Sequence, residues 1–357
     1  MAEQTTGTDQ AERPYERGRA ESPYNAWQRG EGIPIHKGSY VADLYTAEVG
    51  PWARIGQKAA FVNLADQQYD DAWLIEIAPG GTTEPLHHLF EATYFVLSGR
   101  GATTFWYDES KKQSVEWQGG SIFAPPLNCS YQMFNGSGDE PVRLFGVTNA
   151  PMLINIFRST DFLFNADHSF TDRYAAEENY FSDPGTKIGR NMWKLNFVPN
   201  IRTFGLDNNM NRGAGGQLTN FQIANNSMAV HCSSFPPGTY KKAHRHGAGA
   251  HVIILEGQGY SQVWLEGEEV QKVDWKEGSV LSPREQEYHQ HFNTGQTPAR
   301  YLAFRLGNLD VRHFLPEFPH HQIEYEDEAT AVYDLYVEEC AKRGAAVELP
   351  RPEYRKR

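Results

Sequence analysis

The sequence is poor in cysteine and in long apolar runs. It has three cysteines in 357 residues, at the unpatterned positions Cys129, Cys232 and Cys340. A low, odd number argues against a disulfide framework and fits a reducing compartment, so we expect a cytoplasmic protein. No apolar run approaches the roughly 18 residues that a membrane-spanning helix needs. The polar N-terminus also lacks the apolar segment of a secretory signal.

Positive charge is scarce as well. The chain has 33 basic and 45 acidic residues, a net charge of −12, and no long basic cluster. Nucleic acids and anionic membranes bind basic surfaces, so we expect neither as a partner. The chain does have 13% aromatic residues and enough length for two domains with sizeable cores. Its partner is therefore expected to be a small molecule in a lined pocket.

Short apolar runs separated by glycine and proline turns dominate the chain from about residue 60. The run 73–77, which ends at Pro79-Gly-Gly81, is typical. This spacing predicts an all-β sandwich or small barrel and disfavours alternating strand–helix units. The segment 324–344 differs, because its apolar residues recur at helical spacing and Gly344 follows them. We expect a C-terminal helix there, covering a barrel or a neighbouring subunit.

An internal repeat divides the strands into two halves. Gly257 stands 158 positions after Gly99, and the same offset relates other landmarks of the chain. These landmarks are His88 and His246, Gly120 and Gly278, Pro125 and Pro283, Tyr131 and His289, and Asn135 and Asn293. A constant offset without a gap predicts two copies of one barrel.

The repeat and the composition predict the domain organisation. The first 30 residues are polar and rich in Glu, Arg, Gln and Gly, which is typical of a loosely attached arm. The expected parts are an N-terminal arm (1–40), barrel 1 (41–160), a linker (161–205), barrel 2 (206–315), and a C-terminal helix and tail (316–357).

The second copy carries histidines at spacings that suit a metal ion. If the stretch is an extended strand, His244 and His246 share one of its faces, and His289 follows 43 positions after His246. Three neutral imidazoles suit Fe(II), Zn, Mn, Ni or Cu and leave positions for water, oxygen or substrate. His251 is expected as a fourth ligand, or as a pocket residue or proton acceptor. His291 is expected to share the face of His289 and to support it or handle protons.

The first copy lacks most of these imidazoles. Leu86 stands opposite His244 and Tyr131 opposite His289, so only His88 remains. Leucine cannot bind a metal and neutral tyrosine is a poor ligand, so we expect barrel 1 to be a degenerate, metal-free copy. The alternative is a weak second site formed by three of its side chains, His87, Glu91 and Tyr131. Four further histidines have no ligand spacing and are interpreted as ordinary: His231, His313, His320 and His321.

The histidine segments resemble the two motifs of the cupin family. Ala243-His-Arg-His246, followed by Ile-Ile-Leu-Glu-Gly257 and later by Tyr288-His-Gln-His291, is similar to the gentisate 1,2-dioxygenase group. The resemblance implies a bicupin of two jelly-roll barrels, and an Fe(II)-dependent, ring-cleaving site with His244, His246 and His289 as ligands. The group usually has an arginine just after the position of His251, where this chain has Val252. The resemblance covers well under half of the chain.

Three functions are hypotheses at this point. The first is a non-haem Fe(II) dioxygenase that cleaves a hydroxylated aromatic compound resembling gentisate or salicylate, or a related C–C bond. In it, His251 or His291 would handle protons and Arg305 would hold a carboxylate or phenolate. The second is a cupin lyase, decarboxylase, hydrolase or isomerase that uses Mn, Zn or Ni. The third is a non-enzymatic binding protein. The expected partners are a small-molecule substrate, O2 for the first hypothesis, and further copies of the chain in a homo-oligomer.

Overall fold

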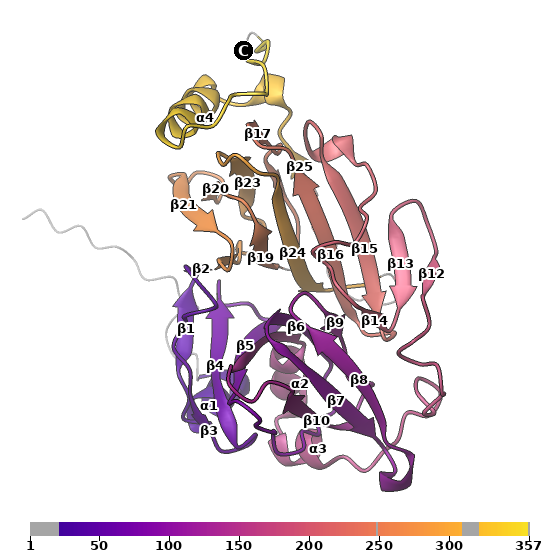
Figure 1. Ribbon diagram of the computed structural model, residues 1–357. Helices are drawn as coiled ribbons and strands as arrows, with labels where there is room; N and C mark the ends of the chain where they lie inside the picture. Colours follow the sequence, from indigo (N-terminus) through magenta and orange to yellow (C-terminus); the bar gives the residue numbers. More distant parts are fainter. Residues whose placement is uncertain (1–20, 248, 309–320, 356–357) are drawn as a thin grey trace, which may run out of the picture.

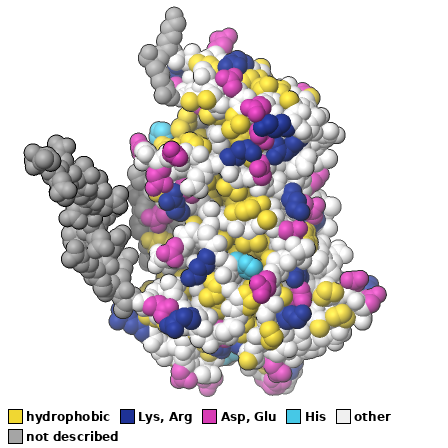
Figure 2. Space-filling model, turned by 90° about the vertical axis from the view of Figure 1, so that its left-hand side faces the viewer, with side chains coloured by type: hydrophobic (Ala, Val, Ile, Leu, Met, Phe, Trp, Pro, Cys, Tyr) yellow, Lys and Arg dark blue, Asp and Glu magenta, His cyan; other side chains and the backbone are white. Residues whose placement is uncertain are grey.

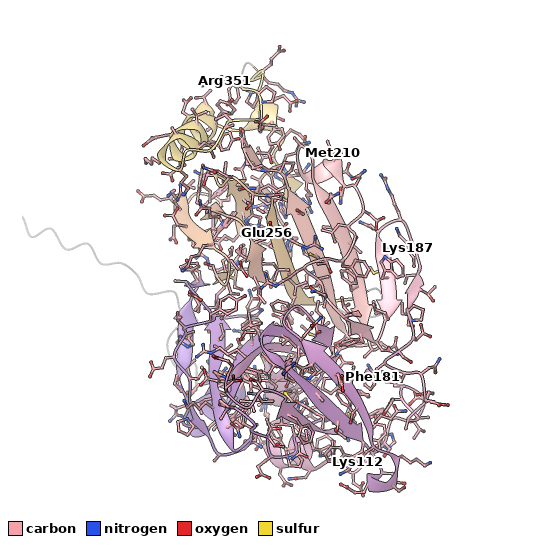
Figure 3. All side chains as sticks on the ribbon, in the orientation of Figure 1. Lys112, Phe181, Lys187, Met210, Glu256 and Arg351 are labelled. Atoms are coloured by element: carbon pink, nitrogen blue, oxygen red, sulfur yellow. The ribbon has the colours of Figure 1, made fainter. Side chains whose placement is uncertain are left out.

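The computed structural model describes residues 21–355, apart from residue 248 and residues 309–320. Two β-barrels follow one another along the molecule, and helix α4 (Thr330–Lys342) covers the far end of the second (Figure 1). Lys112 in the first barrel and Arg351 in the C-terminal tail lie toward opposite ends (Figure 3). The expected all-β fold of two barrels with a C-terminal helix is confirmed.

The first barrel consists of an eight-stranded and a three-stranded sheet. Its elements, with the helices beside it, are α1 (Pro23–Gly30), β1 (Ile35–Gly38), β3 (Gly50–Trp52), β4 (Gln57–Leu64), β5 (Asp71–Ile77), β6 (Ala92–Ser98), β7 (Arg100–Trp106), η1 (Glu109–Lys111), β8 (Gln113–Gln118), β9 (Ile122–Phe123), β10 (Ser130–Asn135), β11 (Val142–Thr148), α2 (Ala150–Phe157), α3 (Thr160–Asn165) and β14 (Phe197–Val198). The larger sheet has the order β1-β4-β5-β11-β6-β9-β14, with β3 beside β4, and the smaller has the order β10-β7-β8.

The second barrel consists of an eight-stranded and a six-stranded sheet. Its elements are β2 (Tyr40–Val41), β12 (Thr186–Lys187), β13 (Met192–Leu195), η2 (Met210–Arg212), β15 (Gln217–Ile223), β16 (Met228–Phe235), β17 (Thr239–Tyr240), β18 (His244–Arg245), β19 (His251–Glu256), β20 (Gln258–Trp264), β21 (Gln271–Lys276), β22 (Val280–Leu281), β23 (Tyr288–Asn293), β24 (Ala299–Leu306), β25 (His321–Gln322) and η4 (Tyr325–Asp327). The sheets have the orders β12-β13-β15-β16-β24-β19-β22-β2 and β21-β20-β23-β18-β25, with β17 beside β23.

The two barrels exchange edge strands. Strand β2, from the N-terminal part of the chain, pairs with β22 of the second barrel. Strand β14, from the segment between the barrels, pairs with β9 of the first barrel. Each exchange covers the edge of a sheet with backbone hydrogen bonds from the other half, which blocks that edge to other chains. The segment 161–205 therefore contributes strands to both barrels, although a linker was expected there.

The large sheets of the two barrels pack face to face. Strand β19 shows why its sequence is a continuous apolar run: Ile253 and Leu255 face the core between the barrels, whereas Val252 and Ile254 face the inside of barrel 2. Successive residues of a strand point to opposite faces, so a strand buried on both faces must be apolar throughout. This packing holds the two barrels in one orientation.

The inside of barrel 1 is filled with aromatic side chains. Trp73 packs among rings from neighbouring strands, and Gly146 on β11 makes room for it, since a Cβ at Gly146 would lie 2.3 Å from Trp73 Nε1 and 2.6 Å from Tyr94 Cε1. Helix α1 adds Tyr24 and Trp27 to this core, so part of the expected N-terminal arm is a packed helix. Residues 1–20 of that arm lie outside the described residues. The boundaries proposed at residues 41, 160, 206 and 315 remain predictions.

The C-terminal helix and the surface complete the description. Tyr336 of α4 packs against Tyr240 and Phe292, so the helix covers barrel 2, and Gly344 after it has a φ of +66°. On the face shown in Figure 2, acidic and basic side chains are interspersed without a large basic area. No helix among the described residues is long and apolar enough to cross a membrane.

Substitution of Gly146 by alanine is expected to destabilise the protein by about 2 kcal/mol or more, because the added methyl group overpacks Trp73 and Tyr94. The free energy of unfolding in urea measures the effect. Gly205→Ala is the matched control, since a Cβ at Gly205 meets no atom within 4 Å. Equal stability of the two variants would contradict this account of the barrel 1 core.

Candidate metal centre

Three histidines of barrel 2 converge as the spacing predicted. Ligand nitrogens of His244, His246 and His289 all lie within 4.8 Å of one another, and we call these residues the three-histidine cluster. His244 on β18 pairs directly with His289 on β23, which brings residues 45 positions apart side by side. His246 completes the group, with its ring centre 5.1 Å from that of His289.

Backbone carbonyl groups orient all three rings. The Nδ1 atoms of His244, His246 and His289 lie 3.2, 3.1 and 3.0 Å from the carbonyl oxygens of Lys242, Gly247 and Glu287, respectively. A carbonyl oxygen only accepts a hydrogen bond, so each Nδ1 carries the proton and each Nε2 has the lone pair. This is how proteins orient histidines that bind metals. The residues present therefore fit a metal ion at this position.

The electrostatic environment keeps the rings of His244 and His246 neutral. Burial, followed by the charge of His289 when protonated, lowers the pKa of His244 and His246 well below the usual value. A neutral imidazole is the form that binds a metal. Among the described residues, no carboxylate belongs to the three-histidine cluster.

His251 does not join the cluster, contrary to the expectation of a fourth ligand or a pocket residue. Its ring lies on the same face of β19 as Ile253 and Leu255, toward the core between the barrels. Its Nδ1 atom is 3.4 Å from Asp70 Oδ1 and its Nε2 atom is 4.0 Å from Asp71 Oδ1. The alternation of the strand explains the difference: Val252, one position later, faces the inside of the barrel.

His291 does lie inside barrel 2. It is 3% exposed, and its ring centre is 5.7 Å from that of His289 on the same strand. Its Nδ1 atom is 2.7 Å from Ser261 Oγ, which also accepts a hydrogen bond of 3.0 Å from Trp275 Nε1. With Nδ1 bound to Ser261, Nε2 is the nitrogen that can exchange a proton with a ligand.

Several ionisable side chains share this barrel, and two of them, His231 and Lys241, were missed in the sequence. Arg305 belongs to the inward-facing row of β24 that includes Tyr301 and Ala303. His231, interpreted as ordinary, lies beside it: burial and then Arg305 lower the pKa of His231 to about 3, and its ring is 6.1 Å from Tyr301. Lys241 is 2% exposed. Only the alternation of inward-facing and outward-facing side chains along β16 could have indicated His231. Two other histidines interpreted as ordinary, His313 and His320, lie outside the described residues.

Comparison with known proteins agrees with this arrangement. Residues 232–305, which contain the three-histidine cluster, match the family described as Cupin domain. An oxalate decarboxylase from Bacillus subtilis superposes with a TM-score of 0.52 at 10% identity, over 84% of this chain and 82% of that one. The chain has a bicupin fold. Vicilin from Corylus avellana superposes with a TM-score of 0.50 at 12% identity, over 84% of this chain and 94% of that one. No curated protein sequence matches the chain.

The first barrel of the bicupin keeps the backbone but not the site. An isolated bridge joins Leu86 and Tyr131, as His244 and His289 are joined in barrel 2. His88 is bound between the carbonyl oxygen of Phe90, at 2.6 Å, and the hydroxyl of Tyr131, at 2.7 Å. Burial lowers the pKa of His88 to about 3. Its nitrogens are thus engaged by the core of the barrel.

The alternative of a weak second site in barrel 1 is wrong, because its three side chains point apart. His87 contacts the carbonyl oxygens of Phe164 and Asn128. Glu91 forms an ion pair of 2.7 Å with Arg173 and accepts a hydrogen bond from the backbone of Ser227. Tyr131 remains inside the barrel beside His88. Tertiary contacts of the linker and of barrel 2 therefore hold His87 and Glu91 away from Tyr131.

Replacement of His246 by asparagine is expected to lower the affinity for Mn(II) or Zn(II) by about 100-fold or more, because one of three nitrogen ligands is lost. Metal content per chain after dialysis, measured by mass spectrometry, tests this. The control is His88→Asn, the same change at the equivalent position of barrel 1. A metal content that is unchanged in His246→Asn would contradict the site.

Asp71 is expected to make stability depend on pH. Burial raises the pKa of its carboxyl to about 7, opposed by His251 and by hydrogen bonds from Tyr24, Ala72 and Gln28. A carboxyl with a higher pKa in the folded state stabilises the fold most at low pH, and this contribution is lost as the pH rises toward 7. We expect a loss of up to about 4 kcal/mol between pH 4 and 8.

The substitution Asp71→Asn is expected to remove this loss. The free energy of urea unfolding, measured at pH 4, 6 and 8 in both proteins, gives the contribution of Asp71 as their difference. A difference that stays constant with pH would contradict the assignment.

Proposed function

We propose that this bicupin is a metal-dependent enzyme that acts on a small carboxylic acid, with decarboxylation as the favoured reaction and Mn(II) as the favoured metal. The observation that carries the proposal is the three-histidine cluster, whose ligand nitrogens lie within 4.8 Å of one another, with the cationic side chain of Arg305 nearby. The similarity of the fold to oxalate decarboxylases, including the Bacillus subtilis enzyme with its Mn(II) centres, supports this choice of reaction and metal.

The chain's own residues have distinct roles in this proposal. A bound divalent cation would supply a Lewis acid that holds the substrate carboxylate and disperses negative charge. Arg305, on the inward face of β24, would orient an anionic group of the substrate. His291, held by Ser261 at Nδ1, would use Nε2 to orient the water molecule that supplies a proton to the carbon atom that loses CO2, because burial lowers the pKa of this ring well below its usual value and keeps it neutral. Loss of CO2 with gain of a proton balances the reaction without an oxidant.

A second candidate is the non-haem Fe(II) dioxygenase expected from the sequence. One observation favours it: the described cluster has three imidazoles and no carboxylate, which leaves coordination positions for a substrate with two adjacent oxygens and for O2. His291 would again handle the proton. In either case a homo-oligomer is a further prediction, which light scattering tests.

The two candidates are expected to differ in their use of oxygen. Chelator-treated protein is reloaded separately with Mn(II), Fe(II), Zn(II) or Ni(II) and offered oxalate, other small carboxylic acids and hydroxylated aromatic acids. We expect CO2 release without net consumption of O2, strongest with Mn(II). His289→Asn is expected to lower the rate by at least about 100-fold, whereas His88→Asn retains activity.

Two other results would change the conclusion. Consumption of one O2 molecule per substrate molecule by the Fe(II)-loaded protein would mean that the protein is a dioxygenase and not a decarboxylase. A lack of turnover of every compound with every metal would count against an enzyme and favour a binding protein.

A further inference from the structure

Lys241 is a buried cation inside barrel 2. It directly follows β17, is 2% exposed, and lies on the opposite side of the chain from Tyr240, which packs outward against α4. Its Nζ atom donates a hydrogen bond to Ser233 Oγ. The same atom lies 5.3 Å from the ring centre of Phe235 and 5.0 Å from that of Tyr301.

This environment leaves the ammonium group of Lys241 without a counter-charge. Within the part of the chain that the structure describes, Lys241 forms an ion pair with no Asp or Glu; its polar side-chain contact is Ser233. Ser233 donates its own proton to the carbonyl oxygen of Gln217, at 2.7 Å, so it accepts one of the three N–H groups of Lys241. The two aromatic faces attract a cation but accept no full hydrogen bond. A buried charge with unmet donors opposes folding.

The fold itself does not need a lysine here. At the offset of 158 residues, Thr83 stands in barrel 1 where Lys241 stands in barrel 2, and Ile75 stands where Ser233 stands. Thr83 uses its hydroxyl oxygen to accept a hydrogen bond of 3.0 Å from the backbone of Met133. The same position of the barrel fold thus has a neutral side chain in barrel 1 and a charged one in barrel 2, and barrel 2 is the one with the three-histidine cluster.

A continuous row of side chains connects Lys241 with the three-histidine cluster. The ring of Tyr301 contacts the Lys241 ammonium on one side, and its centre is 5.3 Å from the ring centre of His291. His291 is in turn next to His289 of the cluster. The backbone N–H of Lys241 also donates to the carbonyl oxygen of His291, at 2.9 Å. The ammonium and the cluster therefore lie at the two ends of one inward-facing row.

We propose that Lys241 and Ser233 form an anion subsite that binds a carboxylate group of the ligand of barrel 2. A carboxylate would accept the remaining N–H groups of Lys241 and supply the missing negative charge. The subsite itself requires no metal. The conclusion about the substrate rests on the proposed function, in which a metal ion at the three-histidine cluster binds one carboxylate group. A ligand bound by the cluster at one end of the row and by Lys241 at the other has two acidic groups, so the substrate class is a small dicarboxylic acid.

The experiment uses the full chain after removal of metal with a chelator. Oxalate, malonate, succinate and glutarate are the probes, and calorimetry measures their affinity for wild type, Lys241→Met, Lys241→Arg and the control Lys112→Met. Lys112 also lies over an aromatic ring, that of Trp106, but on the surface of barrel 1. We expect at least one dicarboxylate to bind wild type and Lys112→Met alike, to bind Lys241→Met at least 10-fold more weakly, and to bind Lys241→Arg measurably.

Unfolding in urea without any carboxylate provides a second, independent measurement. Lys241→Met is expected to unfold at the same or a higher urea concentration than wild type, because it removes a buried charge that pairs with no carboxylate among the described residues. Addition of the bound dicarboxylate is expected to raise the midpoint of wild type and to leave that of Lys241→Met unchanged.

The proposal fails if every dicarboxylate binds wild type and Lys241→Met equally, or if none binds wild type. It also fails if Lys241→Met unfolds more easily while its affinity is unchanged, since the lysine would then be structural. If the proposed function fails but the anion subsite exists, the results differ. The dicarboxylate still binds the metal-free protein through Lys241, but the protein binds no metal or does not turn the dicarboxylate over.

Discussion

The face-to-face packing of two large sheets is the interaction on which the rest of the structure depends. Strand β19 is buried on both faces in it, with Ile253 in the core between the barrels and Val252 inside barrel 2. Burial of apolar surface on both faces provides a large stabilisation that does not depend on the site. The exchanged strands β2 and β14 add backbone hydrogen bonds at the edges of the same sheets. Because the scaffold is stable, the inside of barrel 2 can hold polar groups that oppose folding.

The two barrels show what one backbone does with two sets of inward-facing side chains. Strand pairs occur at equivalent positions, such as Gly101 with Trp117 and Gly259 with Trp275. Barrel 1 fills its interior with rings and engages both nitrogens of His88. Barrel 2 instead has imidazoles, a lysine and an arginine among its inward-facing side chains. The difference between a core and a site is therefore made by a few inward-facing positions.

Electrostatics gives barrel 2 its chemical character. Buried imidazoles stay neutral and can bind a cation, while the nearby cationic side chains disfavour their protonation. A divalent cation would increase the positive potential further. Such an environment suits a small anion. Selectivity would then depend on where each carboxylate group can be placed.

The sequence by itself determined the two barrels, the C-terminal helix and the three-histidine cluster, because a constant offset, strand alternation and helical periodicity can be found in the order of residues alone. It could not determine the place of His251, because one residue of strand register moves a side chain to the opposite face of the sheet. The exchange of β2 and β14, and the convergence of His231, Lys241 and Arg305, also depended on the tertiary structure. Those contacts join segments far apart in the chain, so no local pattern records which side chains will meet.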